Sequence, residues 1–226
     1  ALNLIIKAKK MGLIPYGISF HVGSQQRDIG QWDSAIGKSK YLFNLAKEQG
    51  IELKMLNLGG GFPANYLTPT KNVIEYCNAI KNYLKIHFDN EIPEIFIEPG
   101  RSIVADSGVI VSEIVLISKK SDYNHLYWIY LDVGKYNGLI ETSDEITKYP
   151  IFSMEYIDNN EEKINTVLAG PTCDSTDIMY EKFNYKLPKK IKEGDKIIIL
   201  TTGAYTQTYS SVFFNGIPPL KTYFIK

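Results

Sequence analysis

Strand-like and helix-like segments alternate through the first half of the chain, and this alternation limits the possible folds more than any other feature. Short apolar stretches are predicted to form strands at 16–20, 53–58 and 95–97, and segments with helical spacing separate them. Such alternation is typical of βα units whose strands form a parallel sheet or barrel. A complete (β/α)8 barrel takes about 250 residues and eight units. Only three strands of this kind are recognisable here, so we expect an incomplete barrel.

Three helices are predicted in this half of the chain. Apolar spacing indicates helices at 1–11 and 32–49, and Thr68-Pro69 has the pattern of an N-cap followed by proline at the first helical position. The residues on the predicted buried face of the third helix are Val73, Cys77, Ile80, Leu84 and His87. We therefore interpret Cys77 as a core residue rather than a reactive thiol.

The character of the sequence changes near residue 106. Beyond it, stretches rich in Val, Ile, Tyr and Phe predict strands at 109–117, 126–131, 165–168, 196–201 and 220–225. No helix of comparable strength is recognised there. We predict two domains, at 1–106 and 107–226, the second an all-β module with an antiparallel sheet or barrel-like core.

The stretch Leu58-Gly59-Gly60-Gly61-Phe62-Pro63 follows the second predicted strand. Three consecutive glycines are costly in conformational entropy, so the structure must require them. One interpretation is a tight turn into the next helix. The other is an anion-binding loop, in which backbone N–H groups converge on a phosphate.

The first and third predicted strands also run into unusual clusters, Phe20-His21-Val22-Gly23-Ser24 and Glu98-Pro99-Gly100-Arg101. In a (β/α)8 barrel these positions are the carboxyl ends of the strands, where active sites lie. Arg101 alone is also compatible with a structural ion pair, Glu98 with a solvated surface residue and His21 with a core histidine.

Composition excludes several classes of function. Lys and Arg total 25 and Asp and Glu total 25, so the chain lacks the basic excess expected of a nucleic-acid partner. Zero net charge weakly favours an oligomer. No apolar run reaches membrane-spanning length, and no signal peptide opens the sequence. Two cysteines are too few for a disulfide framework. We therefore expect a cytoplasmic protein that has no membrane partner.

Taken together, five motifs resemble the fold-type III pyridoxal-phosphate decarboxylases, the ornithine/lysine and diaminopimelate decarboxylase family. They are Phe20 to Ser24, Gly59 to Pro63, Glu98 to Arg101, Gly170-Pro171-Thr172-Cys173-Asp174 and Gly203-Ala204-Tyr205-Thr206. The resemblance implies the C-terminal part of an alanine-racemase-like (β/α)8 barrel, followed by the β domain. The final segment is then expected to pack back on the barrel.

The resemblance also implies that the cofactor is pyridoxal 5'-phosphate. Its phosphate would be held by Gly59, Gly60 and Gly61 together with Ser24 and Tyr205. Gly100 and Arg101 would complete this part of the site, the arginine as a cation.

Two further side chains would act on the cofactor ring. Glu98 would pair with the pyridine nitrogen and keep it protonated, so that the ring accepts electrons when the substrate loses carbon dioxide. His21 would stack on the ring face, as in the family.

The β half supplies the residues that the resemblance places at the substrate. Cys173 would protonate the carbanion, and Asp174 would bind the distal ammonium of a diamino acid. An ungapped match favours Glu145 as a second carboxylate, with Asp144 as the alternative. Phe214, in a tail that resembles the ornithine/lysine branch, completes the predicted substrate site. No metal site is predicted.

One departure from the family is large. The lysine that would carry the cofactor lies in an earlier barrel segment of the family, in a motif resembling Tyr-Ala-Val-Lys-Ala, and no such motif occurs here. We therefore expect the chain to be the C-terminal portion of the family's length and to be inactive alone.

The predicted function is decarboxylation of L-ornithine or L-lysine to putrescine or cadaverine in polyamine biosynthesis, by a homodimer with shared active sites. Diaminopimelate or carboxynorspermidine-type decarboxylation is the enzymatic alternative. An inactive, antizyme-inhibitor-like binding protein is the alternative from another class.

Overall fold

The computed structural model describes residues 1–121, 123, 125–157 and 161–225. The chain forms two compact units. The first comprises Ala1–Ala64 and Thr70–Ile103, and the second comprises Asn65–Pro69 and Val104–Lys226. Each unit is described by itself below.

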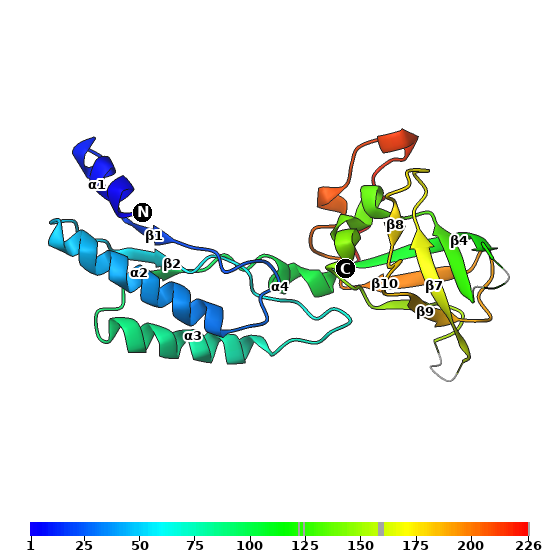
Figure 1. Ribbon diagram of the computed structural model, residues 1–226, viewed down its shortest axis with the longest axis horizontal. Helices are drawn as coiled ribbons and strands as arrows, with labels where there is room; N and C mark the ends of the chain where they lie inside the picture. The colour runs from blue at the N-terminus through cyan, green and yellow to red at the C-terminus, as the bar shows by residue number, and fades with distance from the viewer. Residues whose placement is uncertain (122, 124, 158–160, 226) are drawn as a thin grey trace. The chain divides into compact units, whose positions relative to one another are not determined.

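The first unit is a three-stranded parallel sheet with helices along it (Figure 1). Its elements are α1 (Leu2–Lys10), β1 (Gly17–Ser19), α2 (Gly30–Glu48), β2 (Met55–Asn57), α3 (Val73–Phe88), β3 (Glu94–Phe96) and the start of α4 (Arg101–Val104). The sheet order is β1-β2-β3, and the pairing of β1 with β2 ends at Ser19 and Asn57. All three strands therefore end at the same edge, as the alternating pattern predicted.

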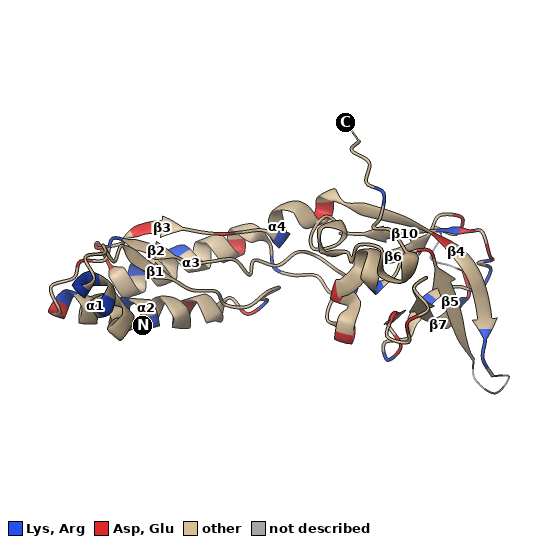
Figure 2. Ribbon diagram, turned by 90° about the horizontal axis from the view of Figure 1, so that it is seen from above, with Lys and Arg blue, Asp and Glu red and all other residues tan. Residues whose placement is uncertain are grey.

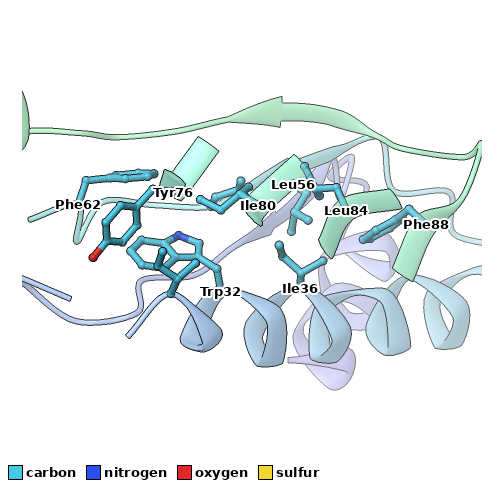
Figure 3. Packing of buried hydrophobic residues seen from close by; sticks show 10 residues of the cluster. Trp32, Ile36, Leu56, Phe62, Tyr76, Ile80, Leu84 and Phe88 are labelled. Carbon is cyan, nitrogen blue, oxygen red and sulfur yellow. The ribbon is translucent and has the colours of Figure 1, made fainter. Parts of the chain in front are cut away.

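The core of the first unit lies where α2 and α3 face β2 (Figure 3). The buried residues of α3 are Tyr76, Ile80, Leu84 and Phe88, which recur every fourth position and so form one apolar stripe. Against them α2 packs Trp32 and Ile36, both fully buried. Burial of these large apolar side chains is the main force that holds the layers together.

Two predictions for α3 were wrong. Its N-cap is Asn72 rather than Thr68, because Asn72 and Glu75 form a capping box in which each side chain accepts the other's backbone N–H. Cys77 is exposed, as is Val73. The buried stripe is therefore offset from the predicted face, and the aromatic residues Tyr76 and Phe88 define it.

The second unit is dominated by a seven-stranded sheet. Its strands are β4 (Val109–Lys119), β5 (Leu126–Leu131), β6 (Ile151–Ser153), β7 (Lys163–Ala169), β8 (Ile178–Met179), β9 (Tyr185–Pro188) and β10 (Lys196–Leu200). Their order is β6-β10-β4-β5-β7-β8, and β9 also pairs with β7. Short helical turns complete the unit: η1 (Ala105–Ser107), η2 (Lys135–Leu139), η3 (Ile140–Glu145), η4 (Gln207–Tyr209) and η5 (Phe214–Gly216).

The sheet differs from the predicted antiparallel module in two respects. Strands β5 and β7 pair in parallel, because the long connection between them returns the chain to the same end of the sheet. The segment 220–225, predicted as a strand, has no regular structure. Its residues 221–225 are exposed, so its apolar side chains do not have the burial that a paired strand would give them.

The short segment Asn65–Pro69 packs with the second unit although it lies between β2 and α3 in the sequence. The backbone N–H of Leu67 donates to the carbonyl oxygen of Lys148 at 2.8 Å. The rings of Tyr66 and Tyr149 meet edge to face with their centroids 5.3 Å apart. These contacts over a large sequence separation could not be read from local sequence patterns.

Two buried tyrosines hold the segment that leads into β6. The Tyr180 hydroxyl donates to the carbonyl of Thr147 and accepts the N–H of Tyr149. The Tyr185 hydroxyl donates to the carbonyl of Tyr149 and accepts the N–H of Ile151. Burial raises the pKa of Tyr185 to about 12. Both phenols are therefore neutral donors at physiological pH. Their hydrogen bonds satisfy backbone groups that would otherwise pair with a neighbouring strand.

Charged residues of both signs are interspersed over each unit in the view of Figure 2, in keeping with the balanced composition. Among the described residues, no helix has both the length and the apolar character needed to cross a membrane.

Candidate active site

The three glycines after β2 contact the backbone of the neighbouring strand ends. A Cβ added to Gly59 would lie 2.1 Å from the carbonyl oxygen of Phe20. One added to Gly60 would lie 2.7 Å from the carbonyl oxygen of Glu98, and one added to Gly61 would lie 2.4 Å from that of Gly23. Any side chain would therefore separate the loops that follow β1, β2 and β3. The glycines bring the three predicted motifs of the first unit together.

The glycine loop also presents free hydrogen-bond donors. The N–H of Gly59 donates to the Asn57 side chain at 2.9 Å. Within the described part of the chain, no protein acceptor takes the N–H groups of Gly60 and Gly61. Gly60 is buried, so an unmet N–H there is unfavourable unless a ligand accepts from it. The structure thus explains the glycine run by close backbone packing, and anion binding by the loop stays a prediction.

A hydroxyl and a cation lie beside this loop. Arg101, at the start of α4, is buried and donates through Nη2 to Ser24 Oγ at 3.1 Å. Gly100 precedes it and accepts the N–H of Ile103, which begins the helical turn. A buried guanidinium attracts an anion more strongly than an exposed one, because less solvent screens its charge.

His21 and Glu98 border the glycine loop from the two outer strands. A Cβ on Gly60 would lie 3.4 Å from His21 Nε2, which places the imidazole over that glycine. The other ring nitrogen, Nδ1, accepts the N–H of Gly23 at 2.9 Å. Nδ1 is therefore unprotonated, and a neutral ring carries its proton on Nε2. Both side chains are exposed, so a ligand can reach them.

Asn57 orients the Glu98 carboxylate. Because Asn57 Oδ1 accepts from Gly59 N–H, its amide group must point the other way, and Nδ2 donates to Glu98 Oε1 at 2.8 Å. This leaves Oε2 of Glu98 available for another donor. Asn57 is not among the predicted site residues, although a polar residue at the end of an apolar strand was a usable signal.

These residues fit pyridoxal phosphate. A phosphate dianion needs several donors and a cation, which the N–H groups of Gly60 and Gly61, the Ser24 hydroxyl and Arg101 provide. A protonated pyridine nitrogen needs an acceptor, which Oε2 of Glu98 provides. The donors and the acceptor lie at the carboxyl ends of parallel strands, the usual position of a ligand site in such sheets.

In the second unit, Cys173 and Asp174 lie in the turn after β7. Cys173 is exposed, and its φ of 59° is the left-handed conformation that non-glycine residues rarely adopt. Asp174 Oδ1 accepts from the backbone N–H of Thr176 at 2.8 Å and from its hydroxyl at 2.6 Å. These hydrogen bonds hold the pKa of the Asp174 carboxyl below its ordinary value. The carboxylate is therefore ionised, as binding of an ammonium group requires.

Phe214 lies near the Cys173 turn. Asn215 Nδ2 donates to the carbonyl oxygen of Thr172 at 2.8 Å, which ties η5 to that turn. The Phe214 ring packs on Tyr136 with centroids 4.4 Å apart. The Tyr136 hydroxyl in turn contacts Thr176 Oγ1. The structure thus brings Cys173, Asp174 and Phe214 into one cluster, and it adds Tyr136.

A buried carboxylate, Asp177, supports this cluster and was missed from the sequence. It is 2% exposed and accepts from the N–H of Lys135 and from both the N–H and the hydroxyl of Thr172. Gly134 and Gly170 make room for it, since a Cβ on either would lie 2.3 Å from an Asp177 oxygen. Asp177 therefore joins the loops that follow β5 and β7.

The remaining candidates lie elsewhere in the second unit. Both carboxylate oxygens of Glu145 accept backbone N–H groups, from Lys182 at 2.6 Å and Phe183 at 2.9 Å, so Glu145 anchors a loop. Asp144 is exposed. Tyr205 is also exposed, and its ring lies 6.2 Å from that of Tyr209. Roles for Glu145, Asp144 and Tyr205 in binding stay predictions.

The glycine loop leads to a testable expectation about stability. Gly59 and Gly50 share a left-handed backbone, with φ of 64° and 68°, but a Cβ on Gly50 meets nothing within 4 Å. Gly50→Ala should therefore cost only about 1–2 kcal/mol of conformational strain. Gly59→Ala should cost about 1–3 kcal/mol more from the overlap with Phe20. Urea unfolding of the two variants measures the difference, and equal losses would contradict the close packing.

Comparison with known proteins links the first 105 residues to one family. Residues 1–105 match the family model of the pyridoxal-dependent decarboxylases, pyridoxal binding domain. Over these residues the chain is similar to this family, the fold-type III decarboxylases, and the cofactor of the family is pyridoxal 5'-phosphate. The predicted resemblance and cofactor are confirmed.

The chain is similar to decarboxylases with different substrates. It is 34% identical to diaminopimelate decarboxylase of Staphylococcus aureus (strain COL), over 93% of this chain and 48% of the relative. It is 28% identical to lysine/ornithine decarboxylase of Selenomonas ruminantium, over 96% of this chain and 52% of the relative. The chain thus spans about half the length of the curated relatives that it matches.

Among solved structures, the chain is similar to lysine/ornithine decarboxylase of Vibrio vulnificus complexed with cadaverine. The two share a TM-score of 0.83 and 32% identity, over 96% of this chain and 57% of that one. The likeness shows that this chain shares part of the alanine-racemase-like fold of these enzymes.

Proposed function

We propose that this chain forms part of a pyridoxal-phosphate-dependent decarboxylase that acts on a basic amino acid, L-ornithine or L-lysine. The observation that carries the proposal is the meeting of three strand ends, at which free N–H groups, Arg101 and the oriented Glu98 carboxylate lie together. This arrangement lies in the region that matches the pyridoxal-binding family model.

Pyridoxal phosphate, when bound, supplies an electron-accepting ring that stabilises the negative charge left after carbon dioxide departs. Gly60, Gly61 and Arg101 would bind its phosphate, with Ser24 as a further donor. Glu98 would hold the proton on the ring nitrogen, because an ionised acceptor at that position favours the charged pyridinium. His21 would cover one ring face and exclude water from it.

The second unit would act on the substrate. Cys173 would deliver the proton that replaces the lost carboxyl group. Because Cys173 is exposed, the solvent can then reprotonate its thiolate. Asp174 would bind the distal ammonium group through Oδ2, because Oδ1 already accepts two hydrogen bonds from Thr176. Phe214 would contact the methylene groups of the substrate, and Tyr136 supports its ring.

Two observations bear on the substrate, and they point to different enzymes. The Asp174 carboxylate suits a cationic side-chain end, which ornithine and lysine have, so the products would be putrescine or cadaverine. The identity of 34% with a diaminopimelate decarboxylase favours diaminopimelate, which carries a carboxylate beside the distal amine. Asp174 would repel that carboxylate, so we rank diaminopimelate second.

We propose further that the enzyme is a cytoplasmic homodimer whose sites are completed by the β half of the partner. An inactive binding protein would be under no demand to keep an exposed Cys173 next to an ionised Asp174.

Release of carbon dioxide by the full-length protein, loaded with pyridoxal phosphate, tests this function. We expect kcat/KM for ornithine or lysine to exceed that for diaminopimelate by about tenfold or more, since one repelling carboxylate costs at least about 1.4 kcal/mol. A preference for diaminopimelate would support the second candidate. Bound cofactor without carbon dioxide release from any of the three would indicate the inactive relative.

A further inference from the structure

Gln25, directly after the predicted phosphate-binding Ser24, makes two reciprocal hydrogen bonds to the backbone beyond the glycine loop. Its Nε2 donates to the carbonyl oxygen of Ala64 at 2.6 Å, and its Oε1 accepts the N–H of Ala64 at 3.0 Å. The side chain thus pairs with one residue of another segment as a neighbouring strand would. Gln25 is partly buried, and it belongs to none of the roles assigned above.

This pairing connects two loops that lie beyond the hydrogen-bonded register of β1 and β2. The register of β1 and β2 ends at Ser19 and Asn57, before either loop begins. Beyond that point, the loop 21–26 and the loop 59–64 each follow an irregular path. Without a bridge between them, the distance from Ser24 to the N–H groups of Gly60 and Gly61 would vary.

A second contact and the core fix the same two loops from the other side. The N–H of Gln26 donates to the carbonyl oxygen of Gly61 at 2.8 Å, which sets the plane of the peptide after Gly61. The hydroxyl of the buried Tyr76 donates to the carbonyl oxygen of Gln26 at 3.0 Å. Tyr76 packs against Trp32 and Phe62 in the core, as Figure 3 shows. Gln25 is the remaining bridge, and it lies one residue from Ser24.

The backbone of Gln25 has an unfavourable conformation, which its surrounding contacts must maintain. Its φ of 52° lies in the left-handed region, which costs a non-glycine residue about 1–2 kcal/mol. Such a conformation persists when surrounding contacts require it. Here the side chain makes its two hydrogen bonds to Ala64, while the neighbouring Ser24 Oγ accepts a hydrogen bond from Arg101.

We propose that Gln25 is a positioning residue for the phosphate of the cofactor, and this rests on the proposed function. The Gln25 amide has both a donor and an acceptor, so it satisfies the N–H and the carbonyl of Ala64 together. By fixing the distance between the two loops, Gln25 lets Ser24, Gly60 and Gly61 donate to one phosphate. It contributes to binding through the phosphate and not through the ring.

The test is equilibrium dialysis of full-length protein with pyridoxal 5'-phosphate and, separately, with pyridoxal, which lacks the phosphate. Gln25→Met keeps the length of the side chain and removes both hydrogen bonds. Gln25→Asn keeps an amide and tolerates the left-handed backbone, but it is too short to reach Ala64. Gln31→Met is the matched control, because Gln31 is exposed and donates only to the Asp28 side chain within the described residues.

We expect both Gln25 variants to bind pyridoxal phosphate about tenfold more weakly, which corresponds to the loss of one to two neutral hydrogen bonds. Pyridoxal binding should change by less than about twofold, and Gln31→Met should bind both ligands as the wild type does. A thermal unfolding midpoint near that of the wild type confirms that a variant is folded.

Three results would overturn the inference. The first is wild-type affinity for pyridoxal phosphate in either folded Gln25 variant. The second is an equal loss of affinity for both ligands, which would assign Gln25 a general structural role. The third is a wild-type protein that does not prefer pyridoxal phosphate over pyridoxal, which would remove the phosphate site and the proposed function with it. The first two leave the proposed function intact, so the two failures are distinguishable.

Discussion

Replacement of Glu98 by glutamine should leave the cofactor bound and lower kcat by roughly 10²-fold or more, the size of effect seen when a charge partner is removed at a reacting centre. The structure explains why an amide cannot substitute. Asn57 Nδ2 points at Glu98 Oε1, because Asn57 Oδ1 is occupied by Gly59 N–H. A glutamine must turn its oxygen toward Asn57, and its NH₂ group would then be the group offered to the ring nitrogen of a bound cofactor. A second donor at that position would disfavour the protonated ring.

Glu94→Gln is the matched control for this variant. Glu94 begins β3, the strand that precedes Glu98; it is exposed and accepts a hydrogen bond from the Tyr16 hydroxyl at 3.0 Å. It lies before the strand end, so its substitution should not alter kcat. The measurement is carbon dioxide release at saturating cofactor, with bound cofactor quantified independently. An unchanged kcat in Glu98→Gln would show that Glu98 serves only to hold Asn57.

The second large effect is recovery of activity when two inactive variants are mixed. If the site is shared between subunits, Glu98→Gln damages the barrel part and Cys173→Ala damages the β part of each site. A mixed dimer then has one site with both substitutions and one with neither. Random exchange makes about half of the dimers mixed, so about a quarter of wild-type activity should return.

Subunit exchange must be shown separately, for example with differently tagged variants. Controls are each variant incubated alone, which should stay inactive, and Cys173→Ala mixed with itself under a second tag. If both groups act within one subunit, every site carries one lesion and mixing restores nothing. Demonstrated exchange without recovery would therefore place Cys173 in the site of its own subunit.

The first unit was predictable because its signals are local. The apolar stretches placed β1, β2 and β3 within about two residues, and the parallel order follows from their alternation with helices. The errors arose where two local signals competed. Thr68-Pro69 resembled a helix start, but the capping box of Asn72 and Glu75 satisfies the N-terminal backbone donors better. Cys77 was assigned to the core because the buried face was placed about one position out of phase.

The second unit was less predictable because its contacts join distant parts of the chain. The parallel pairing of β5 with β7 joins residues far apart in the sequence, such as Leu126 and Asn165, which no periodicity reveals. For the site, motif residues such as Gly60, Glu98 and Asp174 could be proposed from sequence. The supporting residues Gln25 and Asp177 could not, because Ala64 lies 39 positions from Gln25 and Lys135 lies 42 positions from Asp177.

The carboxylate of Asp177 lies in close contact with Gly134 and Gly170, and this close packing has an evolutionary consequence. A larger residue at either glycine would displace the carboxylate, and loss of the carboxylate would leave the N–H groups of Lys135 and Thr172 without their acceptor. The effects of substitutions at the three positions are therefore not additive. A lineage can leave this arrangement only through simultaneous changes, so the three residues should be inherited or replaced as a set.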